Sequence, residues 1–364
     1  MVDLAGGRNI LDDAAAMARA DTEDMLGHVY GLADQVADGW RRSRELELPW
    51  SQPSAVAVLG VGGSATGADL VKSAFADRIS VPFEVLRGYD LPAWVGPDTL
   101  VIASSRGGDT EETLRQLETA LARRCPVVAV TGGGALRRVA EAAGLPLAVM
   151  PEGGPTRAAV GWSVAVIAGI LERTGTLDID DAEIETSVAA AREAVARFEP
   201  AVPTADNPAK QLAWSLVDRY VVVAASDYLA PVARHWKAQL NLHSKTAAAV
   251  EELPEATHST VVGFEQPESL RDHLAVVFLA GEQTHARNRL QAQLFGDLLE
   301  TGQIWHTFVE ARGGGRLGQV LGALAEGDYV SLYLAFMYAI DPSSAGVVAH
   351  IREQRELADQ TAEA

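Results

Sequence analysis

Two glycine- and hydroxyl-rich loops carry the residue types that bind phosphate groups. Residues 60–67 read Gly-Val-Gly-Gly-Ser-Ala-Thr-Gly, residues 104–113 read Ser-Ser-Arg-Gly-Gly-Asp-Thr-Glu-Glu-Thr, and each loop follows an apolar run. Glycines let backbone N–H groups approach an anion, and the start of the following helix adds a partial positive charge. Hydroxyls add charge-assisted hydrogen bonds, although Asp109 or Thr110 would also suit a helix N-cap. The loops together predict a site for a phosphate monoester.

The first loop also satisfies the loose dinucleotide-binding pattern GxGxxG/A through Gly60, Gly62 and Ala65. That pattern requires an acidic residue about 20 positions further on, at the end of the second strand, to hold the ribose of a nicotinamide cofactor. In this chain Glu84 lies inside the second expected strand and Arg87 ends it. A nicotinamide-dependent enzyme is therefore the weaker interpretation of this loop.

Short apolar runs alternate with helical patterns along the first half of the chain. A strand that is covered on both faces of a parallel sheet reads as continuously apolar. The expected strands are residues 55–60, 81–86, 99–104, 126–131 and 145–150, and the expected helices are 67–75, 110–123 and 135–143. This alternation predicts an α/β fold, a parallel sheet with helices on both faces. Ligands of such sheets bind at the carboxyl ends of the strands, where both loops lie.

A second cycle follows a polar, alanine-rich helix at about residues 180–198 and the prolines Pro200 and Pro203. The expected strands are 220–225, 274–280 and 304–310, and the expected helices are 230–242, 285–301, 317–325, 329–340 and 344–357. We therefore expect four parts, namely an N-terminal helical segment (1–47), a first subdomain (48–178), a linker helix (179–213) and a second subdomain (214–364).

The composition excludes several partners and sites. The 364 residues carry 30 Lys and Arg against 49 Asp and Glu, a formal charge of −19, which argues against nucleic acid and an anionic membrane surface as partners. Cys125 is the single cysteine and no CxxC or HExxH pattern occurs, so we expect no disulfide and no metal site. The chain shows no signal-peptide pattern and no membrane-length apolar run, so we expect a cytoplasmic protein.

Eight segments carry a resemblance in collinear order: residues 59–65, 87–95, 108–113, 156–161, 236–241, 244–245, 254–258 and 328–335. Together they resemble the bifunctional phosphoglucose/phosphomannose isomerase family of archaea and bacteria. The resemblance implies two flavodoxin-like sugar isomerase (SIS) subdomains, a homodimer with sites near the subunit interface, a small sugar phosphate as ligand, and no metal or organic cofactor. It also implies the reaction, in which glucose 6-phosphate and mannose 6-phosphate both reach fructose 6-phosphate through one cis-enediol.

The resemblance also assigns roles to single residues. The phosphate is held by Gly63, Ser64, Ser105 and Thr110, Arg157 stabilises the enediolate charge, His258 opens the sugar ring, and Arg352 stands where the family has an active-site lysine. The family pattern SxSGxT has a second serine where this chain has Gly107, so one hydroxyl is missing.

The general base of the family is also missing. Family members read Asn-Glu-Asn-Ser-Lys where residues 241–245 read Asn-Leu-His-Ser-Lys, so Leu242 occupies the position of the glutamate. Loss of a positioned base costs about 10²- to 10⁴-fold in rate. His243, Glu251 and Glu252 are candidates to replace it, but His243 would point about 100° away from position 242 if the helix continued. Two hypotheses stay open: a phosphosugar isomerase with a relocated base or a related substrate, and a non-catalytic, regulatory sugar-phosphate-binding protein.

Overall fold

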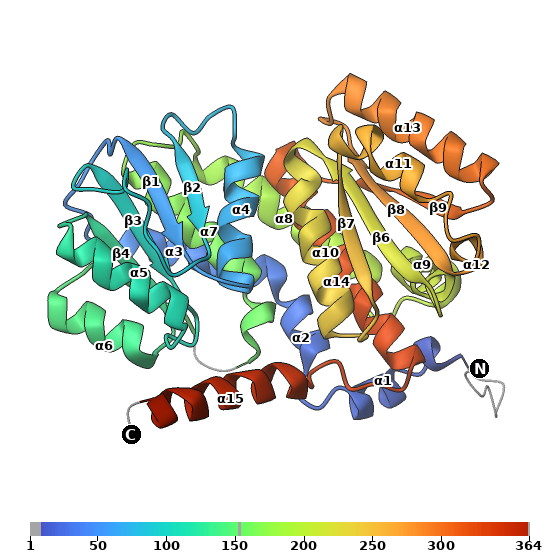
Figure 1. Cartoon of the computed structure of the whole chain (residues 1–364), viewed down its shortest axis with the longest axis horizontal. Helices are drawn as coiled ribbons and strands as arrows, with labels where there is room; N and C mark the ends of the chain where they lie inside the picture. The colour runs from blue at the N-terminus through green and yellow to red at the C-terminus, as the bar shows by residue number, and fades with distance from the viewer. Residues whose placement is uncertain (1–8, 152–153, 363–364) are drawn as a thin grey trace.

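The chain folds around two parallel β-sheets that lie side by side (Figure 1). The computed structural model describes residues 9–151 and 154–362. Helices cover both faces of each sheet, and α4 (Gly63–Ala74) packs against α10 (Ala230–Leu242) between the two sheets. The predicted α/β class is therefore confirmed.

The first sheet has the strand order β2-β1-β3-β4-β5, with every pair parallel. Its strands are β1 (Ala55–Leu59), β2 (Phe83–Leu86), β3 (Thr99–Ser104), β4 (Val127–Thr131) and β5 (Leu147–Val149). The helices around it are α4 and α7 (Val160–Arg173) on one face, with α5 (Glu111–Ala122) and α6 (Gly134–Ala143) on the other. The three central strands are buried along their whole length, which explains their unbroken apolar runs.

The second sheet has the order β7-β6-β8-β9 and is also parallel throughout. Its strands are β6 (Tyr220–Ser226), β7 (Ala248–Leu253), β8 (Leu274–Gly281) and β9 (Trp305–Ala311), and α11 (Thr260–Gly263), α12 (Leu270–His273) and α13 (Ala286–Thr301) follow on its outer side. β7 was not among the expected strands. It is an edge strand whose residues are only partly buried until Leu253, so two glutamates interrupt its apolar pattern.

One buried helix, α14 (Gly315–Met337), replaces the two helices expected at 317–325 and 329–340. The expected break at residues 326–328 is helical. A Cβ at Gly327 would lie 2.2 Å from Nε1 of Trp236, so the glycine admits the indole of α10, which donates to the carbonyl oxygen of Ala323 at 2.8 Å. Packing against the indole therefore explains Gly327 without a turn.

In the described part of the chain, α14 is the one helix that is long and apolar enough to cross a membrane. Its most apolar window is 94% buried inside the fold. It packs against α8 (Asp181–Phe198), α9 (Pro208–Ser215) and α10, which is the setting of a core helix.

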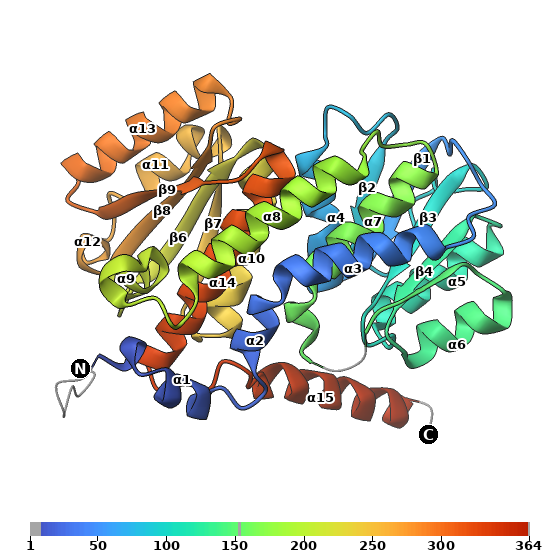
Figure 2. The same cartoon turned by 180° about the vertical axis from the view of Figure 1, so that it is seen from behind.

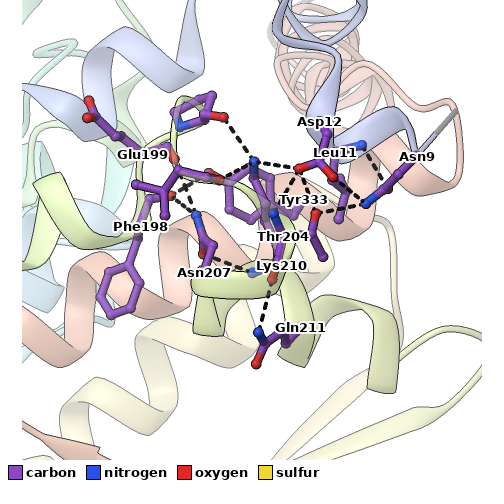
Figure 3. A network of polar contacts seen from close by, with 12 residues as sticks. Asn9, Leu11, Asp12, Phe198, Glu199, Thr204, Asn207, Lys210, Gln211 and Tyr333 are labelled. Atoms are coloured by element: carbon purple, nitrogen blue, oxygen red, sulfur yellow. Dashed lines mark hydrogen bonds and ion pairs between the residues drawn. The ribbon is translucent and has the colours of Figure 1, made fainter.

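The N-terminal segment bridges both halves. It comprises η1 (Ile10–Asp12), α1 (Ala14–Ala20), α2 (Met25–Tyr30) and α3 (Leu32–Glu45). Seen from behind, α3 and α8 run across the back of the molecule, and α3 packs on α7 and α8 (Figure 2). At the other end, the fully buried Lys210 donates to the carbonyl oxygens of Pro200 (2.9 Å) and Val202 (2.7 Å) and lies 3.5 Å from Oδ1 of Asp12 (Figure 3). Thr204 donates to the same carboxylate, so this network ties the N-terminal segment to the region between α8 and α9.

Candidate active site

The two glycine- and hydroxyl-rich loops lie next to each other at the carboxyl ends of β1 and β3. These strands are neighbours, and a Cβ at Gly60 would lie 3.0 Å from the carbonyl oxygen of Ser104. Gly62 precedes α4 with φ +59°, a conformation that favours glycine, and among the described residues no side chain caps the helix. The N–H groups at Gly63 and Ser64 therefore leave the positive end of α4 open to an anion.

The second loop gathers the predicted hydroxyls. The Oγ of Ser105 lies 2.8 Å from Oγ1 of Thr110 and accepts a hydrogen bond from the Gly108 N–H at 3.1 Å. Gly108 must be glycine, because its φ is +81° and a Cβ would lie 1.8 Å from the carbonyl oxygen of Gly133. At Gly107 a Cβ would meet no atom within 4 Å, so the serine of the family pattern would fit there.

The alternative interpretation is that Asp109 or Thr110 caps the helix after this loop. Neither side chain caps α5. Thr110 precedes α5 but makes no side-chain cap bond. The Oδ1 of Asp109 accepts from the Ala135 N–H at 2.8 Å, at the start of α6 instead of α5. The first N–H groups of α5 are thus open to a phosphate oxygen, next to the Ser105–Thr110 hydroxyl pair.

Arg157 lies on η2 (Thr156–Ala158), between β5 and α7, and η2 packs against α4. Arg106 of the second loop donates to the carbonyl oxygen of Pro155, immediately before η2, at 3.1 Å. Nη2 of Arg157 donates to the carbonyl oxygens of Pro342 (2.9 Å) and Ser343 (2.7 Å), whereas its buried Nε has no partner among the described residues. Burial lowers the pKa of this half-buried guanidinium, although nearby carboxylates oppose the effect. The structure thus brings Arg157 to the same end of the sheet as both loops.

The segment 341–344, which joins α14 to α15 (Gly346–Ala362), covers this arginine. The carboxylate of Asp341 accepts from the Thr22 hydroxyl at 2.6 Å and from the Ser343 N–H at 2.9 Å. The Oγ of Ser343 also donates to Oδ1 of Asp21 at 3.2 Å and accepts from the Glu23 N–H at 3.1 Å. The turn between α1 and α2 therefore holds the segment in place.

His243 is fully buried and lies just after the end of α10, which stops at Leu242. Its Nδ1 lies 2.9 Å from Oγ of Ser331, and its Nε2 has no hydrogen-bond partner within the described ranges. Burial, followed by the charge of Arg157, holds the pKa of the imidazole well below its ordinary value. The half-buried Leu242 offers no acid-base group at this place.

Sequence reasoning missed two residues of this cluster. Lys245 has φ +57°, and its Nζ donates to the carbonyl oxygens of Leu242 and of Ser344, the latter at 2.6 Å. Ser331 lies on α14 and holds the imidazole of His243. Both residues stand inside segments that carry the family resemblance, which was the signal available for them.

His258 and the two glutamates lie away from this cluster in the same chain. His258 ends η5 (Glu255–His258) and is exposed, beyond the carboxyl end of β7, whereas His243 precedes the amino end of that strand. Six residues of strand separate these ends by about 17 Å. Glu251 accepts from the Thr260 hydroxyl at 2.6 Å, and Glu252 pairs with Arg234. One chain therefore does not bring His258 to Arg157.

The backbone of Arg352 belongs to α15, and its side chain lies outside the described part of the structure. α15 reaches the first sheet, because Arg355 pairs with Glu111 at the start of α5 and donates to the Tyr89 hydroxyl at 2.8 Å. Arg352 thus lies one turn from a residue that contacts the second loop. Within residues 9–151 and 154–362, no group of three or more His, Cys, Asp or Glu residues could hold a metal ion.

Two parallel sheets, each with helices on both faces, and glycine- and hydroxyl-rich loops at the strand ends define the class of two-subdomain SIS folds. Residues 205–354 match the family model described as the bacterial phospho-glucose isomerase C-terminal SIS domain. Over 94% of both chains, the fold is similar to the crystal structure of a hypothetical protein from Thermus thermophilus, with a TM-score of 0.75 and 16% identity.

Similarity over most of the sequence is more specific. The chain is 32% identical over 322 residues to a bifunctional phosphoglucose/phosphomannose isomerase of Caldicellulosiruptor bescii, covering 88% of this chain and 95% of that protein. It is 27% identical over 296 residues to the enzyme of the same name from Aquifex aeolicus, covering 81% and 88%. The chain belongs to the bifunctional phosphoglucose/phosphomannose isomerase family.

Proposed function

We propose that this protein interconverts aldose and ketose hexose 6-phosphates, taking glucose 6-phosphate or mannose 6-phosphate to fructose 6-phosphate through a cis-enediol. The observation that carries the proposal is the meeting of both anion-binding loops with Arg157 at one end of the first sheet. The open start of α4 and the Ser105–Thr110 pair suit a phosphate group. A permanently charged guanidinium beside them suits the charge that develops on the enediolate.

Local cations matter because the whole chain carries a formal charge of −19 while the proposed ligand is an anion. Arg157 and Lys245 lie close enough for the arginine charge to lower the pKa of the lysine, in addition to its burial. The helix starts at α4 and α5 add their dipoles at the phosphate end. The proposed site is thus a cationic region in an acidic protein.

A homodimer is part of the proposal. His258 is exposed and lies at the far end of β7 from His243, so it would serve ring opening at the site of a second copy rather than at its own. A dimer with sites near the interface, as the resemblance implies, would supply that histidine. No cofactor is required, because isomerisation moves one proton within the substrate and leaves its oxidation level unchanged.

The second candidate function is a non-catalytic sugar-phosphate-binding protein with a regulatory role. Two observations favour it: Leu242 cannot accept a proton, and Gly107 removes one hydroxyl from the phosphate loop. The two functions differ in turnover and share ligand binding. A regulator would bind hexose 6-phosphates and leave them unchanged.

The deciding experiment combines binding with turnover. Calorimetry measures binding of glucose, mannose and fructose 6-phosphates, and coupled assays at high enzyme concentration measure isomerisation of each. Proton NMR in D₂O also follows wash-in of solvent deuterium at C1 of fructose 6-phosphate, which detects enediol formation even when net turnover is slow. Binding without turnover or exchange would favour the regulator, and absence of binding would contradict both functions.

A further inference from the structure

We infer that His243 is the general base that moves the proton between C1 and C2, in place of the glutamate whose position Leu242 holds. This inference rests on the proposed function and names the group that would perform its central step. Two features of the cluster carry it: the hydrogen bond that sets the imidazole tautomer, and two buried nitrogens that have no partner among the described residues.

The end of α10 places the imidazole. If the helix continued, a residue at position 243 would point about 100° away from its neighbour at 242. His243 is the C-cap residue of α10, and it keeps helical backbone angles, with its N–H donating to the carbonyl oxygen of Gln239 at 2.7 Å, so its side chain points away from that of Leu242. The side chain of Leu242 stays half-exposed, while the imidazole of His243 is fully buried against α14 through Ser331. His243 therefore supplies a buried imidazole on another side of α10 than the side chain of Leu242, against α14.

The hydrogen bonds set the tautomer. The Ser331 hydroxyl has a single proton, which it donates to the carbonyl oxygen of Asp328 at 2.8 Å. Toward His243 the same oxygen can therefore only accept, so Nδ1 carries the proton at 2.9 Å and Nε2 carries the lone pair. Asp328 is itself fixed, since its carboxylate accepts from Gln239 at 2.8 Å and contacts His235 at 2.6 Å. The free nitrogen is thus in the form that takes up a proton.

Two buried nitrogens in this cluster have no partner among the described residues, and one is a hydrogen-bond donor while the other is an acceptor. Buried polar side-chain atoms in native proteins rarely lack a partner. Nε of Arg157 is a donor, and Nε2 of His243 is an acceptor, and both are buried without a partner in the described structure. The two side chains also interact electrostatically. After burial, the charge of Arg157 lowers the pKa of His243, as do His235 and Lys245. A donor for an enediolate oxygen and an acceptor for a carbon-bound proton in one cluster are the two groups that the isomerisation needs.

The other candidate bases do not share this setting. Glu251 is already engaged by the Thr260 hydroxyl, and Glu252 is exposed and paired with Arg234. Both lie in the second half of β7, toward its carboxyl end and away from Arg157. Of the three residues that could replace the missing glutamate, His243 alone belongs to the arginine cluster.

The proposed step is balanced. Nε2 of His243 takes the C2 proton of the open-chain aldose, and the electron pair of that C–H bond forms the C1–C2 double bond as the carbonyl π pair moves to O1. Arg157 stabilises the resulting enediolate charge, and the hydroxyl proton passes from O2 to O1. As the O2 pair forms the new C2 carbonyl, the double-bond pair takes the proton from the imidazolium at C1. No electrons leave the substrate.

The test uses the full-length protein and the variant His243→Gln, whose amide can still donate to Ser331. We expect deuterium exchange at C1 of fructose 6-phosphate to fall by about 100-fold or more, as for loss of a general base. Calorimetric binding of 5-phosphoarabinonate, which carries a carboxylate at the place of the enediolate oxygens, should change by less than about 5-fold, since that ligand needs no base. Unchanged exchange in the folded variant would overturn the inference and leave the proposed function intact, whereas no exchange in the wild type would overturn both.

Two further variants cover the case in which His243→Gln fails to fold. Ser331→Ala leaves the imidazole in place but frees its tautomer, and we expect exchange to fall by about 10-fold with a shifted pH profile. Leu242→Glu restores a carboxylate at the position of the family glutamate. As a single variant it should exchange deuterium faster than the wild type, and combined with His243→Gln it should restore the exchange that His243→Gln loses. If Ser331→Ala leaves both rate and pH profile unchanged, the buried imidazole is a structural residue and the inference is wrong.

Discussion

The carbonyl oxygen of Ser343 lies 2.7 Å from Nη2 of Arg157 and accepts a hydrogen bond from it. The same nitrogen also donates to Pro342 at 2.9 Å, so backbone of the segment before α15 fixes one end of the guanidinium. Nε stays unpartnered within the described residues, and the arginine lies near enough to His243 for its charge to contribute to the lowered pKa of that imidazole. The segment thus orients the arginine while leaving one buried donor for a ligand.

Arg157→Lys tests this orientation. Lysine keeps the charge but has no fork that could hold two carbonyl oxygens and still present an inward donor. We expect kcat to fall by about 100-fold, with a smaller change in KM, because the lost interaction belongs to the enediolate rather than to the phosphate. Steady-state kinetics of the folded variant measure both. A change confined to KM would mean that Arg157 binds the substrate uniformly and has no special role at the enediolate.

Gly107→Ser should strengthen phosphate binding. A Cβ at this position meets no atom within 4 Å, and the added hydroxyl supplies the hydrogen bond that the family pattern contains. A hydrogen bond to a charged group contributes about 1.5–3 kcal/mol, so we expect the Kd for a hexose 6-phosphate to fall by about 10-fold or more. Calorimetry measures it.

Gly108→Ser is the matched control for that variant. Its Cβ would lie 1.8 Å from the carbonyl oxygen of Gly133 at φ +81°, so it should lower the melting temperature instead of the Kd. Equal affinities for wild type and Gly107→Ser would show that no phosphate oxygen approaches position 107.

If His243 is the base, kcat should fall in acid only at a pH that is unusually low for a histidine. Burial and the charge of Arg157 lower the pKa of His243, so the imidazole stays neutral through its ordinary titration range. The acid limb of kcat should therefore lie below about pH 6.5. An acid limb at or above that pH, in a folded enzyme, would show that the base is another group.

The lowered pKa of His243 also makes the stability of the fold depend on pH. When pH falls below about 6.5, the unfolded chain protonates this histidine while the folded chain does not, so the free energy of unfolding decreases. This loss begins at the unfolded pKa and continues until the lower folded pKa. Urea denaturation at several pH values should show it in the wild type and show less of it in His243→Gln.

Sequence patterns could predict the central strands and both loops, because buried parallel strands and glycine turns leave local signals. β7 escaped prediction because an edge strand is covered less completely than a central one, and it tolerates the partly buried Glu251 and the exposed Glu252. The direction of His243 could not be predicted either. The predicted end of the helix at residue 242 is correct, but the contact of the imidazole depends on a hydrogen bond to Ser331, 88 positions further along the chain. The separation of His258 from Arg157 likewise follows from the undetected strand.

Lys210→Met should destabilise the fold far from the candidate site. Its fully buried ammonium donates to the carbonyl oxygens of Pro200 and Val202, which would lose their partner. Leaving buried acceptors unsatisfied costs about 1–3 kcal/mol each, so we expect a clearly lower free energy of unfolding by urea denaturation. Asp12→Asn is the control, because its carboxylate is half-exposed at 3.5 Å from the ammonium and should matter by less than about 1 kcal/mol. Equal effects of the two variants would assign the stability to the ion pair.

Complementation between two inactive variants tests whether one site draws on two chains. Arg157→Ala and His258→Asn should each abolish most isomerisation, because the enediolate contact or the ring-opening group is lost. If His258 serves the second copy, a mixed dimer has one site with both residues intact and one with neither. Random mixing makes half of the dimers mixed, so co-refolded variants should recover about a quarter of wild-type activity. A chain that carries both substitutions, mixed with either single variant, recovers nothing and is the control. Failure of the two single variants to complement would place His258 outside the partner's site, while the exposed position of this residue at the far end of β7 makes recovery the expected result.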